Sequence, residues 1–421
     1  MSLSTQPYKG ARDFYPEDKR LQKYMFGVLR RVAESFGYQE YDAPLLESLE
    51  LYAAKSGEEI VNEQLYSFED RGGRKVAIRP EMTPSVSRLV AARRQELPYP
   101  LRLYSIPDLW RYERPQRGRL REHYQLNVDL FGVDGVEADA EIIQVADAIL
   151  KGFDAAPNMY QIKVNSRKAM LELLEAKGFD EAKAPKVIGA FDRLGKDSFE
   201  KFLKANFKAD ERDMVNDFIN KSPTGAILET KAGQNLSKLI SILGGIGIEA
   251  IPDMSINRGF EYYDDIVFEV FDTNPENNRS MFGGGRYNGL VGLFGVDPVP
   301  TVGFGMGDVT LQNFLEVHNL LPKLKPETDA VVVLIGDVYK QAQPILRGLR
   351  KDGLRLAVDS SKRKLDSQIK SALKSGVRHV IFIGEKELES DTYKLRDLEK
   401  GEEKTLSPEQ IVSSLMVWRE K

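Results

Sequence analysis

Two stretches with strand-like hydrophobic patterns flank an arginine-rich segment in the first third of the chain. The first is the apolar run from Ile106 to Trp110, and the second is Tyr124–Leu130, in which aromatic or apolar residues alternate with polar ones. This order, with Pro115 and Gly118 between the runs, predicts a β-hairpin with a long loop. Five arginines belong to the loop: Arg111, Arg114, Arg117, Arg119 and Arg121.

A helical pattern comes earlier in the chain. Apolar residues recur on one face of a helix over Pro16–Phe36, and Gly37 is a typical stop signal. The residues of that face are Leu21, Met25, Val28, Leu29, Val32 and Phe36. A strand interrupted by Pro44 is expected over Tyr38–Leu46.

Polar residues stand at a second strand-to-helix junction. A strand that begins at Val76 runs into a turn that presents Glu81 and Thr83, and a helix is expected over Ser85–Leu97. Polar side chains at such a junction suit a ligand site, and they equally suit a plain N-cap. The pattern leaves both interpretations open.

Charged helical patterns dominate from Ser166 to about Leu243 and separate two strand-bearing parts of the chain. Strands are expected at Gln161–Asn165 before this block and at Ile266–Phe271 after it. We therefore interpret the block as an inserted helical domain. Farther on, the glycines at Gly283–Gly285 suit a turn or a close approach of backbone to a ligand, and Thr301–Gln312 predicts a strand that leads into a helix.

The last quarter of the chain has a different pattern. After a proline- and lysine-containing linker at Leu320–Glu327, strand and helix patterns alternate, which predicts a small α/β domain with a mainly parallel sheet. The expected elements are Ala330–Ile335, Arg355–Asp359 and His379–Ile383 as strands, with Gln341–Gly353 and Leu365–Gly376 as helices. Residues 328–421 contain 18 Lys and Arg against 15 Asp and Glu, a net charge of +3 that suits modest contact with nucleic acid.

Composition narrows the function classes. The 421 residues suffice for two or three domains, and a net charge of −4 leaves a nucleic-acid partner only local basic patches. The absence of cysteine excludes disulfides and thiolate metal sites, and the three histidines are too scattered to suggest a zinc site. We expect no protein-bound metal, and Mg²⁺ only as part of a nucleotide complex. Because no apolar run is long enough for a transmembrane helix and the first residues lack an apolar signal core, we expect a cytoplasmic protein without a membrane partner.

The arginine-rich loop favours a phosphate ligand. Guanidinium groups bind phosphate oxygens bidentately, and the strand that follows the loop carries amide and carboxylate side chains on one face. A solvated basic loop is the plain alternative from charge alone. The ordered polar face is harder to explain in that way, so it favours a binding site.

Four motifs resemble those of class II aminoacyl-tRNA synthetases in their histidyl form. Arg111–Arg119 is RYERPQRGR, close to the RxERPQxGR of motif 2, and Arg258–Tyr263 is RGFEYY, close to RGLDYY. Gly283–Leu290 is GGGRYNGL, close to GGGRYDGL, and Lys9–Phe14 is KGARDF, similar to the family's opening KGTRDF. The resemblance extends over essentially the whole chain.

The resemblance implies the fold class and the division into domains. It implies an α/β and α+β multidomain protein, in which a class II synthetase antiparallel sheet flanked by helices carries a helical insertion and precedes a C-terminal α/β anticodon-binding domain. The implied boundaries are 1–325 for the catalytic domain, about 166–243 for the insertion and 326–421 for the anticodon-binding domain. In the family the insertion reaches the tRNA acceptor arm; a decoration without such contact is the alternative.

A dimer is also implied. The first helix, the following strand and Pro44 resemble motif 1, which forms the dimer interface in class II synthetases, so a homodimer is expected. From the sequence alone, an amphipathic helix packed on its own sheet is an equal alternative.

The family assigns one set of residues to ATP. By this resemblance Arg111 and Arg258 hold the α-phosphate and are the catalytic residues, and Arg119 faces the terminal phosphate. Glu113 matches a motif 2 glutamate near the nucleotide, with pairing to an arginine of its own loop as the alternative role.

A second set is implied for L-histidine. Glu81, Tyr262 and Tyr263 are the implied ring contacts, while Gln125 and Asp129 face the backbone end, with Asp129 opposite the ammonium group. The set is completed by Thr83, Arg111, Arg258 and Tyr287. Simple packing on a strand is the alternative for the paired tyrosines.

The implied activity has two steps, in which L-histidine is activated with ATP to histidyl-adenylate and then transferred to the 3′ end of tRNA(His). The implied partners are L-histidine, ATP with Mg²⁺ as the substrate complex, tRNA(His) and a second copy of the chain, with no permanently bound cofactor.

Three departures from the family pattern leave another function open. Asp129 stands where the family has glutamate, Asn127 where it has glycine, and Thr310 where motif 3 has an arginine under the adenine. A synthetase paralogue without aminoacylation activity, such as the histidine-sensing regulatory subunit of ATP phosphoribosyltransferase, is therefore the alternative. That class lacks the C-terminal domain, which is present here, so the enzyme is favoured.

Overall fold

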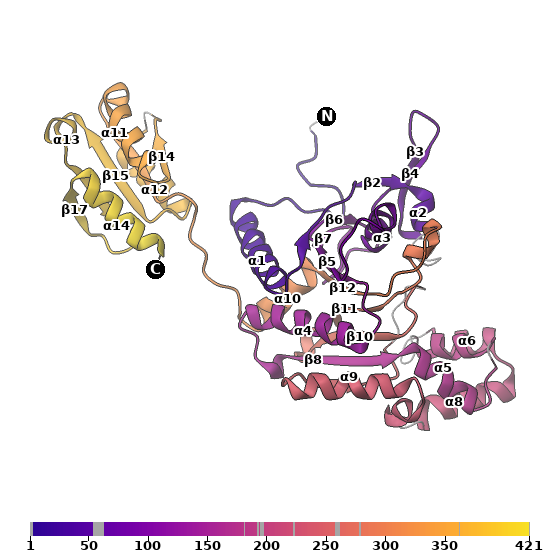
Figure 1. Ribbon diagram of the computed structural model, residues 1–421. Coiled ribbons are helices and arrows are strands. Elements are labelled where there is room, and N and C mark those ends of the chain that lie inside the picture. Colours follow the sequence, from indigo (N-terminus) through magenta and orange to yellow (C-terminus); the bar gives the residue numbers. More distant parts are fainter. Residues whose placement is uncertain are drawn as a thin grey trace. The chain divides into compact units, whose positions relative to one another are not determined.

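Two compact units make up the chain. The computed structural model describes residues 3–53, 63–180, 182–191, 193, 198–221, 224–256, 262–277, 279–361 and 363–420. Residues 1–13 and 23–321 form the first unit, and residues 14–22 and 322–421 form the second. Figure 1 labels most elements of both units.

A large, mostly antiparallel sheet forms the centre of the first unit. Among the described residues its strands follow the order β1-β5-β7-β12-β11-β10-β8-β9, with β6 paired to β7 beside that path. β1 and β9 run parallel to their neighbours, and the other neighbouring strands are antiparallel. The bounds are β1 (Gln39–Glu40), β5 (Leu101–Ser105), β6 (Asp108–Trp110), β7 (Glu122–Phe131), β8 (Tyr160–Ser166), β9 (Ala250–Pro252), β10 (Ile266–Asp272), β11 (Ser280–Arg286) and β12 (Thr301–Gly307).

The arginine-rich hairpin is present with a shorter first strand than predicted. β6 begins at Asp108 because Pro107 has no N–H for a strand ladder, and the Pro107 carbonyl oxygen accepts from the Gln125 backbone nitrogen at 3.1 Å. β7 contains the whole of the predicted alternating strand. The glycines of Gly283–Gly285 lie inside β11 rather than in a turn.

Two predicted helices are present with shifted ends. α1 (Pro16–Ser35) ends one position before the predicted Phe36. α3 (Thr83–Ala92) begins before the predicted Ser85, because a proline in the first turn of a helix needs no N–H donor, and it ends well before Leu97. Other elements around the sheet are α2 (Leu49–Ala53), α4 (Val136–Gly152), α10 (Asp308–Val317) and a small sheet of β2 (Leu46–Ser48), β4 (Lys75–Ile78) and β3 (Tyr66–Glu69).

The strand expected over Tyr38–Leu46, with an interruption at Pro44, is only partly present. The chain forms only β1 and, after a break, β2. Within the break, the guanidinium group of Arg79 donates to Asp42 Oδ1 at 2.9 Å and to the Ala43 carbonyl oxygen at 2.6 Å. Part of the polar backbone there is therefore satisfied by a side chain instead of a neighbouring strand.

Helices occupy the chain between β8 and β9. They are α5 (Arg167–Ala176), α6 (Ala184–Phe191), α7 (Phe199–Asn206), α8 (Ala209–Lys221) and α9 (Gly233–Gly245). α9 packs against α4 and β8, and Figure 1 shows it beside β8. The last helix of the block therefore joins the layer that covers the large sheet.

The second unit contains a five-stranded mixed sheet in the order β14-β13-β15-β16-β17. β13 is parallel to β14 and β15, whereas β15–β16 and β16–β17 are antiparallel, so the expectation of a mainly parallel sheet is only half right. The connection from Gly384 to Tyr393 is too short for a parallel crossover, which needs about a dozen residues. The elements are β13 (Ala330–Ile335), α11 (Tyr339–Lys351), β14 (Leu356–Asp359), α12 (Leu365–Lys374), β15 (His379–Gly384), α13 (Glu385–Ser390), β16 (Tyr393–Asp397), β17 (Glu403–Leu406) and α14 (Pro408–Glu420).

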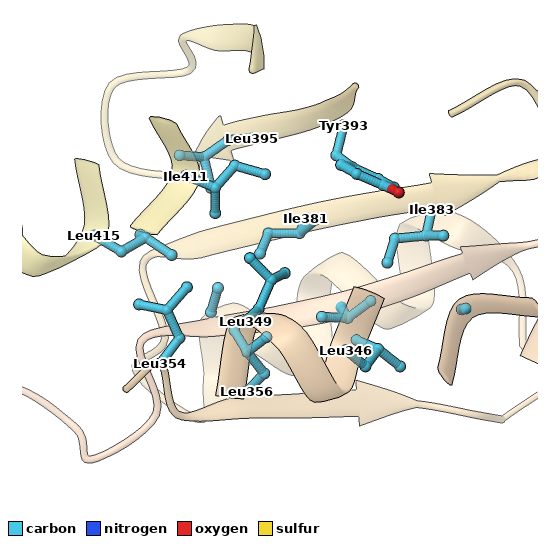
Figure 2. Close-up of a cluster of buried hydrophobic side chains, with 13 residues drawn as sticks. Leu346, Leu349, Leu354, Leu356, Ile381, Ile383, Tyr393, Leu395, Ile411 and Leu415 are labelled. Carbon is cyan, nitrogen blue, oxygen red and sulfur yellow. The ribbon is translucent and has the colours of Figure 1, made fainter. Parts of the chain in front are cut away.

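This second unit has its own hydrophobic core. Figure 2 shows Leu346 and Leu349 from α11 and Ile381 from β15, with Ile411 and Leu415 from α14 completing the cluster. All five side chains are almost fully buried. Burial of apolar side chains stabilises each by about 1.5–3 kcal/mol relative to exposure, so the unit contains what an independent fold needs.

A buried carboxylate joins the first strand of the second unit to its last helix. Asp329, just before β13, is fully buried and accepts from Arg419 Nε near the end of α14 at 2.9 Å. The same carboxylate accepts from the Arg355 backbone nitrogen at 2.7 Å. The start of the first strand and the end of the last helix are thus held at one place.

Candidate functional site

The polar face of β7 lies against a strand of alternating glycines. In the register of β7 with β12, Asp129 is opposite Gly303 and Asn127 is opposite Gly305. A Cβ atom on Gly303 would lie 2.3 Å from Asp129 Oδ1, and one on Gly305 would lie 2.5 Å from Gln125 Nε2. The glycines therefore make room for the polar side chains that form the floor of the site.

A small pocket of about 70 Å³ opens above this floor. Every predicted histidine contact among the described residues lines it, whereas Arg258 lies outside the described residues. The lining residues include Glu81, Thr83, Arg111, Gln125, Asn127, Asp129, Tyr262, Tyr263 and Tyr287. Three motifs far apart in the sequence thus contribute to one pocket.

The tyrosines of the pocket hold its carboxylates. Tyr262 Oη donates to Glu81 Oε2 at 3.1 Å, and Tyr287 Oη donates to Asp129 Oδ1. The rings of Tyr262 and Tyr263 pack 4.8 Å apart, and Tyr287 is 5.6 Å from Tyr262. Two of the three rings therefore pack and also direct a hydroxyl group to an acid, which packing alone does not require.

Asp129 is a buried acid, and one of its two carboxylate oxygens accepts no hydrogen bond from the described residues. Its side chain is 3% exposed, and among the described residues Oδ2 has no hydrogen-bond partner. Burial raises the pKa of Asp129 to about 7, although the hydrogen bond from Tyr287 acts to lower it. A buried carboxylate in this state is stabilised by an added cation or donor, so the pocket suits a ligand that carries an ammonium group.

A second, larger cavity of about 300 Å³ adjoins the first. Arg111, Gln125 and Gly305 line both cavities. The larger one is also lined by Glu113, Gly118, Arg119, Leu120, His123, Glu269, Ser280, Met281, Phe282, Gly307, Val309 and Thr310. It combines cationic side chains with an apolar surface, as a nucleotide requires.

Arg111 stands at the junction of the two cavities. Its Nε donates to the Pro80 carbonyl oxygen at 2.9 Å, which ties it to the segment that carries Glu81. In the loop, Arg119 Nη1 lies 3.5 Å from Glu113 Oε2. Glu113 therefore lines the larger cavity and also pairs with an arginine of its own loop; its role near the nucleotide stays a prediction.

The N-cap interpretation of Glu81 and Thr83 is wrong. The N-cap residue of α3 is Met82, and Thr83 is already the first residue of the helix. Since neither polar side chain occupies the N-cap position, both can serve the pocket that they line.

Several lining residues were not predicted from the sequence, among them His123, Glu269 and Phe282. Burial and the nearby cations Arg111 and Arg12 lower the pKa of His123 to about 3, so its imidazole is neutral near pH 7. Glu269 interrupts an otherwise apolar strand, and that break in the pattern was the available signal.

Thr310 lies at the edge of the larger cavity. Its hydroxyl oxygen lies 2.9 Å from the Met281 carbonyl oxygen and 3.1 Å from that of Gly307, and its single proton can be donated to either. A Cβ atom on Gly118 would be 3.5 Å from Thr310 Cγ2, so the loop packs on this small side chain. The threonine is therefore part of the cavity wall, at the position where motif 3 has its arginine.

Neither a metal-binding cluster nor a membrane-spanning helix is present in the described part of the chain. No three or more His, Cys, Asp or Glu side chains gather there in a way that could hold a metal ion. None of the helices described there has both the length and the apolar character to cross a bilayer.

Comparison with known proteins decides the family. The family model for histidyl-tRNA synthetase matches residues 10–309, and that for the anticodon-binding domain matches residues 329–417. The chain belongs to the histidyl-tRNA synthetase family. The expected family and fold class are thereby confirmed.

Relatives match along nearly the whole chain. A histidine–tRNA ligase of Leptospira biflexa is 42% identical over 420 residues, which cover 96% of each chain. That of Thermoplasma volcanium is 37% identical over 98% of this chain and 99% of its own. The crystal structure of histidyl-tRNA synthetase from Nostoc has a TM-score of 0.80 at 22% identity, covering 99% of this chain and 100% of its own, and so shows the same fold.

Proposed function

We propose that this protein is a histidine–tRNA ligase, an ATP-dependent class II aminoacyl-tRNA synthetase. The observation that carries this proposal is the pair of adjoining cavities that share Arg111. One cavity has acids and hydroxyl groups for a small amino acid, and the other has arginines and an apolar wall for ATP. A reaction between an amino acid and a nucleotide needs both ligands at such a junction.

In the first step, a carboxylate oxygen of histidine attacks the α-phosphorus of ATP. The new P–O bond gives histidyl-adenylate, and the bond to the β-phosphate breaks to release pyrophosphate. We assign Arg111 to the α-phosphate and Arg119 to the terminal phosphate, with Arg258, from its motif alone, as the second α-phosphate ligand. Such transfer depends on positioning and on neutralising charge, so no side-chain nucleophile is required.

The amino acid would be held by both ends. Asp129, with Gln125, would receive the ammonium group of histidine, and Glu81 with Tyr262 and Tyr263 would hydrogen-bond its ring nitrogens. A pocket built to bond polar ring atoms rejects an analogue that lacks them by about 10⁴–10⁵.

The adenine base would rest on the apolar part of the larger cavity. Met281, Phe282 and Val309 supply that surface. Mg²⁺ would arrive on the ATP phosphates, and the carboxylates of Glu113 and Glu269 in the same cavity are suitable oxygen ligands for it. We therefore treat Mg²⁺ as part of the substrate.

In the second step, a hydroxyl group of the terminal ribose of tRNA(His) attacks the adenylate carbonyl, and AMP leaves. We propose residues 1–325 as the catalytic domain, with the helices of about 166–243 toward the acceptor arm, and residues 326–421 as the anticodon reader. A homodimer and a cytoplasmic location remain predictions.

Pyrophosphate exchange tests the proposal. The protein, with labelled pyrophosphate and Mg²⁺–ATP, should incorporate label into ATP only when L-histidine is present, and should then charge tRNA(His). Binding of histidine without exchange or charging would contradict the enzyme and support the histidine-sensing regulatory subunit instead.

A further inference from the structure

A short N-terminal segment, here named the strap (Tyr8–Arg12), lies against the base of the arginine-rich loop. The Gly10 carbonyl oxygen accepts from the backbone nitrogens of Arg121 at 2.9 Å and Glu122 at 3.1 Å. The Arg12 backbone nitrogen donates to Glu122 Oε2 at 3.2 Å. The strap therefore meets β7 where the loop ends.

Arg121 connects the strap to the other side of the loop. Its Nη1 donates to Tyr8 Oη at 3.0 Å, and its Nε donates to the Glu113 carbonyl oxygen at 3.1 Å. Its Cζ lies 3.9 Å from the centre of the Tyr112 ring, in cation–π contact. The Arg121 carbonyl oxygen accepts from the Arg111 backbone nitrogen at 2.8 Å. One residue thus contacts the backbone or ring of each residue from Arg111 to Glu113.

Arg121 does this from behind the nucleotide cavity. It is 8% exposed, and it is absent from the described lining of both cavities, in contrast to Arg111, Glu113 and Arg119. Its Nη1 donates to the strap and its Nε to the loop backbone. These contacts do not bring the charge of Arg121 to a bound phosphate. Arg121 can therefore influence phosphate binding only through the residues that it holds in place.

Gly10 has no room for a side chain beside Arg121. Its φ is +87°, and an added Cβ atom would lie 2.8 Å from Arg121 Cγ. Both the backbone conformation and the close approach require glycine. A methyl group at this position would displace the aliphatic part of Arg121.

We propose that Arg121, held by the strap, is a positioning residue for the ATP phosphates. It fixes the backbone from Arg111 to Glu113 so that both side chains enter the nucleotide cavity. The inference rests on the proposed function, because it concerns the same ATP site. Arg111 also lines the histidine pocket, but the floor of that pocket is formed by β7 and β12, so the effect on histidine should be smaller than the effect on ATP.

The first test is Arg121→Lys, which keeps the charge and loses the guanidinium fork. Displacement of a positioned group typically costs up to about 10²-fold, so we expect the KM for ATP in histidine-dependent exchange to rise at least about tenfold. The KM for histidine should stay within about twofold. Arg74→Lys is the matched control, because Arg74 also uses its Nε, for Asp70 at 2.7 Å on an exposed hairpin.

Two further variants test the positioning role if Arg121→Lys folds poorly. Tyr8→Phe removes only the hydroxyl group that accepts from Arg121 and should raise the ATP KM by about two- to fivefold. Gly10→Ala should reproduce the selective ATP defect. Equal losses for ATP and histidine, or no loss in any of the three variants, would overturn the positioning role.

Calorimetric titration with Mg²⁺–ATP separates this inference from the proposed function. In one outcome, the unmodified protein binds ATP but shows no exchange, and Arg121→Lys binds ATP more weakly. This outcome would support the positioning role and contradict the ligase. In another outcome, the unmodified protein shows normal exchange and Arg121→Lys binds ATP as well as the unmodified protein does. This outcome would support the ligase and contradict the positioning role. An unmodified protein that neither binds ATP nor exchanges would overturn both.

Discussion

Asp129 is expected to lower the stability of the empty protein above neutral pH. Burial raises its pKa to about 7, from about 3.9 in an unfolded chain. The folded state therefore holds the proton more tightly, and the cost of ionisation grows from about pH 4 and is complete above about pH 7. Asp129→Asn, which cannot ionise, should raise the melting temperature measured without histidine, by more at pH 8 than at pH 5. An equal gain at both pH values would contradict this account.

The same substitution should have the opposite effect on the ligand. The amide that replaces the carboxylate is neutral, so the ammonium group of histidine would lose its charged partner. Loss of one partner of a buried charged hydrogen bond costs about 2–5 kcal/mol, which corresponds to a rise in the histidine dissociation constant of at least about 30-fold. Calorimetric titration with histidine at pH 8 measures it, and Asp147→Asn serves as a control, because Asp147 is a buried acid that is not among the described lining residues of either cavity. Unchanged histidine affinity would remove Asp129 from the ammonium site.

Thr310→Arg is expected to change ATP binding only modestly. Arg111, Arg119 and Arg258 already supply the proposed cations, and one added cation–π contact is worth about 0.5–2 kcal/mol. The KM for ATP should therefore change by about one order of magnitude at most in the exchange assay. An unmodified protein without exchange, restored by Thr310→Arg, would identify a silenced paralogue.

At the scale of elements, β12 sets the shape of the histidine pocket. A Cβ atom on Gly303 would lie 2.3 Å from Asp129 Oδ1 and 2.6 Å from the Val128 carbonyl oxygen. Gly303→Ala should therefore raise the KM for histidine at least about tenfold, with a smaller effect on ATP. Gly289→Ala is the control, since a Cβ atom there meets nothing within 4 Å. A larger effect on ATP than on histidine would show that β12 serves mainly the nucleotide.

The elements also show how far sequence reasoning reaches. The alternation of β7 and the turn at Glu81 expose polar residues in short windows, so these members of the pocket could be predicted. Glu269 and Phe282 were missed because a period of two does not say which face meets a cavity until the sheet order is known. That order places β7 beside β12, which is far along the chain.

Two other features could not be predicted from local sequence patterns either. The pairing of Gly10 with Arg121 joins distant parts of the chain, and no window contains both. In the C-terminal sheet, the change from parallel to antiparallel pairing depends on the short connection after Gly384. The pattern of strand residues does not reveal that length.

For the whole molecule, we expect that histidine activation needs only the first unit, whereas charging of tRNA(His) also needs the second. The second unit has a buried core of its own (Figure 2), and the cavities of the site are lined by residues of the first unit. A chain that ends at Lys325 should retain histidine-dependent pyrophosphate exchange within a few fold and charge tRNA(His) poorly. Steady-state charging assays measure the difference. Equal charging by both chains would make the C-terminal unit a passive appendage.

The buried ion pair of Asp329 with Arg419 has a consequence for protein engineering. It fastens the start of β13 to the end of the last helix. A unit closed in this way needs only one attachment region on its host, because nothing has to span its width. The fold from β13 to α14 should therefore tolerate insertion into a surface loop of a host protein, and a circular permutation that links its two ends.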